Sequence, residues 1–144
     1  MNQIITASGF FIRTEDNQVI RFTLYFDEAP MTVQAFAATL PFTRLFFHAR
    51  LSGQEIWTDD APELDIIQEN ASVYAESGEC VIGPLKPHRT RTSKCMGIYY
   101  GNGKGVDCCN IFGKVLEEDL LLPKELGEKI WLKGAQRLTF DISD

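Results

Sequence analysis

The chain has 144 residues, of which 44% are hydrophobic, 11% aromatic and 24% charged, a composition that is typical of a globular protein and excludes a disordered chain. The length fits one domain, so we expect a single domain over residues 1–144. With 20 acidic and 14 basic residues the formal charge is -6, which opposes binding to nucleic acid and to anionic membrane surfaces.

Residues 1–26 are predicted to form a β-hairpin. Two strand-like runs, IITASGFFIRTE and QVIRFTLYF, flank Asp16 and Asn17, which favour a turn. In the second run every second residue from position 20 to position 26 is apolar. This alternation predicts that one face of the strand packs against a core.

Residues 27–41, DEAPMTVQAFAATLP, are predicted to form a short amphipathic helix. Apolar residues recur there at i, i+3, i+4 and i+7, starting from Val33. Asp27 and Thr32 offer side-chain oxygens that could cap its N-terminus, and Pro41 is expected to end the segment.

The rest of the chain is predicted to be mainly β. The expected strands are RLFFHARL, QEIW, GECVI, KCMGIYY, CNIFGKVL and QRLTFDIS, and PKELGEK has room for one or two turns of helix. Many strands at short spacing favour a closed or nearly closed β-barrel capped by one or two short helices, because closure removes exposed strand edges.

The start of the chain, MNQIITASGFFIR, has no basic segment followed by a long apolar one, and no later run approaches the roughly 20 apolar residues of a membrane span. We therefore expect a cytoplasmic protein with no membrane partner. Cys80, Cys95, Cys108 and Cys109 show no C-x-x-C spacing, so we expect reduced thiols that pack in the interior, with no metal site and no cofactor.

The segment FFHARLSGQEIW combines several chemically useful side chains. If the strand is regular, His48 and Arg50 share one face, and Gln54, Glu55 and Trp57 return along a partner strand after a turn at Ser52 and Gly53. One interpretation is a surface network with an Arg50–Glu55 ion pair. The other is a ligand-binding wall, since an arginine beside an indole and an imidazole suits a carboxylate or a planar amide.

Three other segments have simpler interpretations. The basic run KPHRTRTSK, residues 86–94, is either a solvated loop or a lid that attracts anions to the same cleft. The run YYGNGKG lacks the spacing of a P-loop, and its glycines indicate a tight turn whose backbone approaches a neighbour. Trp131 is expected to lie in the core or on a helix-packing surface.

The order of these parts resembles a cyclophilin. The similar segments are LYFDEAPMTVQAF, FFHAR and NIFGKVLEE. A closer resemblance is to a bacterial family of uncharacterised proteins with a cyclophilin-like fold, catalogued as a domain of unknown function, through LPFTRLFFHARLSGQEIW, GECVIGP, YYGNGKG and LGEKIWLKGAQRLTFDIS. Both resemblances imply a cyclophilin-like β-barrel with a candidate cleft.

The cyclophilin resemblance also implies peptidyl-prolyl isomerase activity, with Arg50 in place of the catalytic arginine. FFHAR has one residue more between His and Arg than the family pattern, so either a bulge carries Arg50 into place or His48 takes that position. Further on, Lys94, Met96, Lys104 and Cys109 replace the family's glutamine, phenylalanine, tryptophan and histidine. These replacements favour binding over catalysis.

We therefore predict a protein that binds a small or peptide-like ligand in a cleft on the barrel surface. The alternatives are a divergent isomerase that uses Arg50, and an enzyme of another kind with His48 as general acid or base. The catalytic candidates are Arg50 and His48, and the ligand-binding candidates are Trp57, Glu55, Gln54, Met96, Tyr99 and Asn110. Assembly into a homo-oligomer through an exposed barrel edge stays open.

Overall fold

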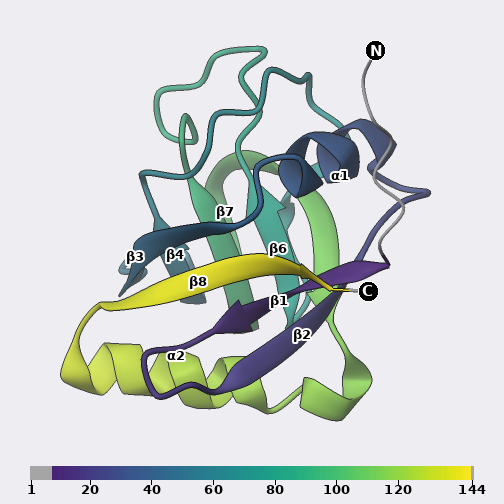
Figure 1. Cartoon of the computed structure of the whole chain (residues 1–144). Coiled ribbons are helices and arrows are strands. Elements are labelled where there is room, and N and C mark those ends of the chain that lie inside the picture. The colour runs from purple at the N-terminus through teal and green to yellow at the C-terminus, as the bar shows by residue number, and fades with distance from the viewer. Residues whose placement is uncertain (1–7, 144) are drawn as a thin grey trace.

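The structure is a computed structural model that describes residues 8–143 (Figure 1). Within them the elements are, in chain order, β1 (Gly9–Arg13), β2 (Val19–Leu24), α1 (Pro30–Ala37), β3 (Phe42–His48), β4 (Gly53–Thr58), β5 (Ala71–Tyr74), β6 (Glu79–Ile82), β7 (Met96–Val115), the 3-10 helix η1 (Glu117–Asp119), α2 (Leu122–Lys133) and β8 (Gln136–Ser143). β5 and η1 have no counterpart among the elements predicted from the sequence.

Six strands hydrogen-bond to one another in a closed ring. Their order is β2-β1-β8-β3-β4-β7, and β7 pairs with β2 to complete the circuit. β5 and β6 each pair with β7 beside this ring. Where β1 meets β8, Gly9 lies opposite Ser143. The predicted closed, mainly β arrangement with two helices is confirmed, and α1 and α2 lie at opposite ends of it (Figure 1).

The interior of the ring is an aromatic core. The alternation predicted for β2 is observed, since buried Ile20, Phe22 and Leu24 each follow an exposed residue of the strand. Phe10 of β1 stacks on Phe22 with 4.8 Å between ring centroids. From the other side, Phe36 of α1 lies 4.5 Å from the ring of Phe112 in β7. The apolar face of α1 therefore covers one end of the core, as the spacing of its apolar residues predicted.

The N-terminus of α1 is capped by a residue distant in sequence. The prediction that Asp27 or Thr32 caps it was wrong, because neither side chain accepts a hydrogen bond from the first turn. Instead the Glu69 carboxylate accepts hydrogen bonds from the backbone N–H of Met31 (3.2 Å) and of Thr32 (2.8 Å). A carboxylate is favourable there, since unpaired N–H groups give a helix N-terminus partial positive charge.

Helix α2 is longer than the one or two turns predicted for PKELGEK, since it extends from Leu122 to Lys133. It ends at Gly134, whose φ of 102° suits glycine. Gly127 lets α2 approach the sheet closely, because a Cβ there would lie 2.1 Å from the ring of Tyr100. Across residues 8–143, neither α2 nor any other helix has the length and apolar character needed to cross a membrane.

β7 corrects a second prediction. The sequence indicated two strands separated by a glycine-rich turn, whereas Met96–Val115 is one strand of 20 residues. The glycines continue the ladder, because Gly103 pairs with Gly53 of β4. The expected close backbone approach is present, since a Cβ on Gly103 would lie 2.3 Å from the carbonyl oxygen of Ser52. Both ends of β7 pair with β6, so the long strand curves around the short one.

Candidate functional site

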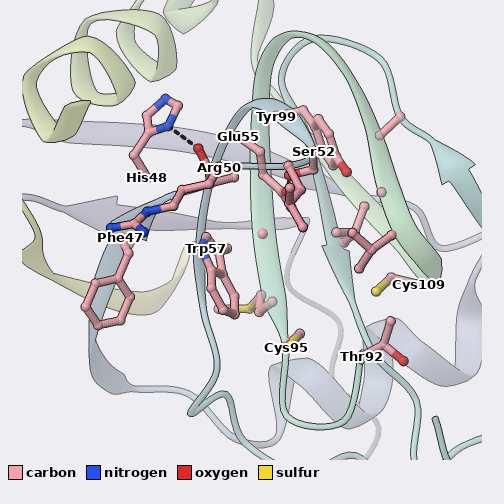
Figure 2. A pocket seen from close by; sticks show the side chains of 18 of the residues that line it. Phe47, His48, Arg50, Ser52, Glu55, Trp57, Thr92, Cys95, Tyr99 and Cys109 are labelled. Carbon is pink, nitrogen blue, oxygen red and sulfur yellow. Dashed lines mark hydrogen bonds between the residues drawn. The ribbon is translucent and has the colours of Figure 1, made fainter. Parts of the chain in front are cut away.

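A cavity of about 790 Å³ opens between the end of β3, strands β4 to β7 and the end of α2 (Figure 2). Its aromatic lining is Phe47, Trp57, Tyr99 and Trp131, and its aliphatic lining includes Val73, Ala75, Val81, Met96 and Ile130. The ionisable groups among its lining residues are His48, Arg50, Glu55, Arg91, Cys95, Asp107 and Cys109, in addition to the Tyr99 hydroxyl. The cavity therefore has a mainly apolar wall with a few polar groups directed into it.

Six of the eight residues predicted for the site line this cavity: His48, Arg50, Glu55, Trp57, Met96 and Tyr99. The other two do not. Gln54 lies on the exposed face of β4, where its Oε1 accepts a hydrogen bond from the backbone N–H of Asn102 at 2.9 Å. Asn110 is fully buried elsewhere, where it donates to Thr32 Oγ1 and accepts from the N–H of Glu69, both at 3.0 Å. Asn110 thus braces the N-terminus of α1, and the prediction that it faces the cleft was wrong.

His48 is held firmly at the last position of β3. Its Nδ1 lies 2.7 Å from the backbone oxygen of Ala49, and its Nε2 lies 2.5 Å from the hydroxyl of Tyr100. Because a carbonyl oxygen only accepts, a neutral His48 carries its proton on Nδ1 and accepts from Tyr100 through Nε2. The ring also meets Trp131 edge-on, with 4.8 Å between centroids. Both ring nitrogens are therefore occupied by protein groups.

Arg50 lies beyond the end of β3, in the bend that leads to β4. His48 and Arg50 were expected to share one face only if the strand continued regularly to Arg50, and it does not, because β3 ends at His48 and the chain turns toward Gly53. Arg50 is exposed, and Figure 2 shows its side chain extending toward Phe47 and Trp57, away from Glu55. Among the ion pairs of the described residues there is none between Arg50 and Glu55.

Glu55 is the buried acid of the cavity, with 8% of its surface exposed. Its Oε1 accepts a short hydrogen bond from the hydroxyl of Ser52, three residues earlier in the chain. Burial raises the pKa of Glu55 to about 7, although hydrogen bonds from Ser52 and Tyr99 oppose that rise. Gly97, across the strand pair, leaves room for the carboxylate, since a Cβ there would lie 1.9 Å from Glu55 Oε2.

The other ionisable groups close to Glu55, which are one tyrosine and two cysteines, have raised pKa values. Burial raises the pKa of Tyr99, and the negative charge of Glu55 adds to that rise. Burial likewise raises the pKa of the Cys95 thiol to about 11 and that of Cys109 to about 12. All four cysteines are free, and Cys80 and Cys109 are the buried ones. At neutral pH the thiols of Cys95 and Cys109 carry no charge, so these two contribute to the cavity as apolar groups.

Trp57 and Phe47 form an aromatic pair on adjacent strands. They lie opposite each other in the β3–β4 register, with 6.4 Å between ring centroids. Trp131 projects from α2 with 64% of its surface exposed. Trp131 therefore does not belong to the core, which was one of the two positions predicted for it. Its ring contacts His48 at the end of β3 and lines the cavity.

The basic segment at residues 86–94 reaches the cavity with two side chains, Arg91 and Thr92. Its other cations form ion pairs at the surface: Lys86 with Asp65 at 3.2 Å, Arg89 with Asp107 at 3.0 Å and Lys94 with Glu63 at 3.6 Å. Thr92 is 2% exposed, and its hydroxyl is one of two buried side-chain atoms in residues 8–143 without a hydrogen-bond partner.

Several lining residues were missed by the sequence interpretation. Ser52 was assigned only to a turn, although its place three residues before Glu55 is suited to a hydrogen bond between the two side chains. Thr92, Cys95 and Trp131 reach the cavity only through the fold. In residues 8–143 no three His, Cys, Asp or Glu side chains are grouped so that they could hold a metal ion. The arrangement can therefore bind an apolar group and offer one buried carboxylate to it.

Comparisons with solved structures show a cyclophilin-like fold. McbB in complex with tryptophan superposes with a TM-score of 0.68 at 15% identity, over 92% of this chain and 44% of the McbB chain, so this chain spans less than half of that protein. The hypothetical protein AF2241 from Archaeoglobus fulgidus gives 0.66 at 17% identity, over 99% of this chain and 100% of that one. A cyclophilin type peptidyl-prolyl cis-trans isomerase from Cryptosporidium parvum, in the presence of the dipeptide Ala-Pro, gives 0.60 at 16% identity, over 94% and 99%.

No curated protein matches the sequence. A family model does match it, over residues 14–142, and that family is described as a protein of unknown function (DUF3830). The resemblance to an uncharacterised family with a cyclophilin-like fold is thus confirmed, and the chain belongs to the DUF3830 family.

Proposed function

We propose that this protein binds a small, mainly apolar molecule, or an apolar side chain of a peptide, in the cavity between β3, β7 and α2. The observation that carries the proposal is the cavity itself, whose volume of about 790 Å³ falls within the roughly 300–1,000 Å³ of typical ligand sites. Its aromatic and aliphatic walls favour burial of an apolar body, and its few polar groups would orient it.

Two proteins of similar fold lend support. McbB has been solved in complex with tryptophan, and the cyclophilin of Cryptosporidium parvum in the presence of Ala-Pro. Both molecules combine an apolar ring with polar groups. At 15% and 16% identity these structures support the general kind of ligand and do not identify it.

The chain provides its own reporter for a binding test. Trp57 and Trp131 line the cavity and are the only two tryptophans in the sequence. We therefore expect 2-phenylethanol, which does not absorb at tryptophan excitation wavelengths, to produce a saturable change in tryptophan fluorescence. A dissociation constant in the millimolar range is expected for a molecule this small and would support the proposal.

Replacing either of two alanines with phenylalanine tests where the probe binds. Ala75→Phe places a large ring in the cavity wall and should abolish the saturable signal, whereas Ala38→Phe adds the same ring at an exposed position outside the cavity and should retain it. Circular dichroism confirms that each variant is folded. Absence of any saturable signal, or an unchanged signal in Ala75→Phe, would overturn the proposal.

Proline isomerisation is a second candidate, because Arg50 and Met96 both line the cavity. Such an enzyme desolvates the X-Pro bond and donates a hydrogen bond to its nitrogen as amide resonance is lost, against a barrier of about 20 kcal/mol. The test is NMR exchange spectroscopy on an Ala-Pro peptide with wild type and Arg50→Ala. Acceleration that disappears in the variant supports the isomerase, and no acceleration by either protein leaves ligand binding alone.

A further inference from the structure

We propose that Glu55 anchors the ligand through a positively charged nitrogen, so that the ligand class is a small amine carrying an apolar or aromatic body. This inference rests on the proposed function, since it names the chemistry of the molecule that would enter the cavity. It follows from three features of the site: the position of the carboxylate, the groups that hold it, and the lack of a cation beside it.

The position of the carboxylate is fixed by the fold. Glu55 extends from the middle of β4 into the cavity lining and is 8% exposed. Ser52 holds Oε1, and Gly97 on the adjacent strand leaves the space that Oε2 occupies. Figure 2 shows Glu55, Ser52 and Tyr99 together at one end of the cavity. The carboxylate is therefore preorganised on a strand and does not need a loop movement to meet a ligand.

No protein cation compensates this acid. The arginines of the cavity lining are Arg50 and Arg91, and neither forms an ion pair with Glu55 in the described part of the chain. The causes that set the pKa of Glu55 to about 7 are burial and two hydroxyl donors, with no positive charge among them. A buried carboxylate without a cation beside it is costly to ionise, so a ligand that brings an ammonium group would supply the charge that the protein lacks.

The surroundings fit the rest of such a molecule. Tyr99 lies beside the carboxylate, and Trp57 with Phe47 extends the aromatic wall toward the opening. Aromatic faces attract cations as well as apolar groups. Asp107, the other carboxylate of the lining, is already paired with Arg89 at 3.0 Å. Glu55 is therefore the acid of the cavity that is available to a cationic ligand.

Three probes of similar size distinguish the possible chemistries: 2-phenylethylamine, 2-phenylethanol and 3-phenylpropionate, each titrated by tryptophan fluorescence. At pH 8 we expect the amine to bind at least tenfold more tightly than the alcohol. Between pH 6 and pH 8 the affinity of the amine should rise about tenfold, because a carboxyl of pKa about 7 changes from mostly protonated to mostly ionised over that interval. The alcohol should show little change.

Other groups that face Glu55 do not titrate in this interval. Burial holds the pKa of Cys95 at about 11, that of Cys109 at about 12 and that of Tyr99 above its ordinary value. Arginine stays charged throughout. Histidines ordinarily titrate near neutral pH, so His48→Asn is measured alongside and should retain the pH dependence.

Glu55→Gln is the decisive variant, since it removes the charge and keeps an acceptor for Ser52. It should bind the amine and the alcohol equally and lose the pH dependence, whereas Glu28→Gln, at an exposed position outside the cavity, should behave like wild type. Binding of the alcohol or of 3-phenylpropionate at least as tight as that of the amine would overturn this inference and leave the proposed function standing. Failure of all three probes would overturn both.

Discussion

Replacing Glu55 with glutamine should change how the stability of this protein depends on pH. In the folded state burial raises the pKa of Glu55 to about 7, whereas its ordinary value is 4.5. Between these two pH values the folded state binds a proton that the unfolded state has released. The change of unfolding free energy with pH is proportional to the number of protons bound by the unfolded state minus the number bound by the folded state. This difference is negative here, so stability falls as pH rises through this window.

The size of the effect follows from the two pKa values. A tenfold difference in proton affinity corresponds to about 1.4 kcal/mol, so the gap between 4.5 and about 7 corresponds to roughly 3 kcal/mol. Glu55 is 8% exposed, so solvent screening reduces this little. The stabilising contribution is fully present below pH 4.5 and is lost as pH rises through 7. Glutamine does not titrate, so the Glu55→Gln variant lacks this pH-dependent contribution to the unfolding free energy.

Urea unfolding at pH 4.5, 5.5, 6.5 and 7.5 measures the difference. The unfolding free energy of wild type minus that of Glu55→Gln should fall by roughly 3 kcal/mol from the lowest to the highest pH. Glu28→Gln, which makes the same substitution at an exposed position, is measured as the control. If the wild-type and Glu55→Gln profiles are parallel, Glu55 is not desolvated in the folded protein, and the reasoning about its charge fails.

Three further substitutions test other parts of the structure. Thr92→Val should raise the unfolding free energy by about 1 kcal/mol, since it removes a buried hydroxyl that has no partner; a decrease measured by urea unfolding would contradict this. Gly97→Ala should lower the melting temperature and remove the fluorescence response to 2-phenylethylamine, because its methyl group takes the place of the Glu55 carboxylate; an unchanged response would show that the carboxylate lies elsewhere. Glu69→Ala should cost about 1–2 kcal/mol through loss of the α1 cap, whereas Asp27→Ala should cost under about 0.5 kcal/mol, and the reverse order in thermal unfolding would restore the local cap predicted from the sequence.

Local patterns in the sequence were sufficient for much of the fold. The alternation in β2 and the helical spacing that begins at Val33 depend on near neighbours in the chain, so both elements could be predicted. β8 was predicted with its observed bounds for the same reason. The order of the cyclophilin-like segments then implied a closed, cyclophilin-like β-barrel. These strands and this helix can be predicted without knowing which residues far apart in the chain contact each other.

The predictions from the sequence were wrong where contacts between residues far apart in the chain determine the local structure. YYGNGKG has the composition of a turn, but pairing with β4 and β5 keeps it extended. Glu69 caps α1 from 38 positions after Met31, which no local capping pattern could reveal. Arg50 was placed on the face of His48 because strand periodicity does not show where a strand ends. Glu55 was identified as a site residue, yet its isolation from Arg50 became visible only in the structure.

The pairing of β1 with β8 has a consequence for engineering. Gly9 and Ser143 are opposite each other in that pair, and directly opposed residues of antiparallel strands lie about 4.5–5.5 Å apart. A linker of a few residues could therefore join them, and new ends could be opened at residues 14–18, between β1 and β2. Such a circular permutant would keep every strand pair of the ring, and none of the residues at the cut lines the cavity.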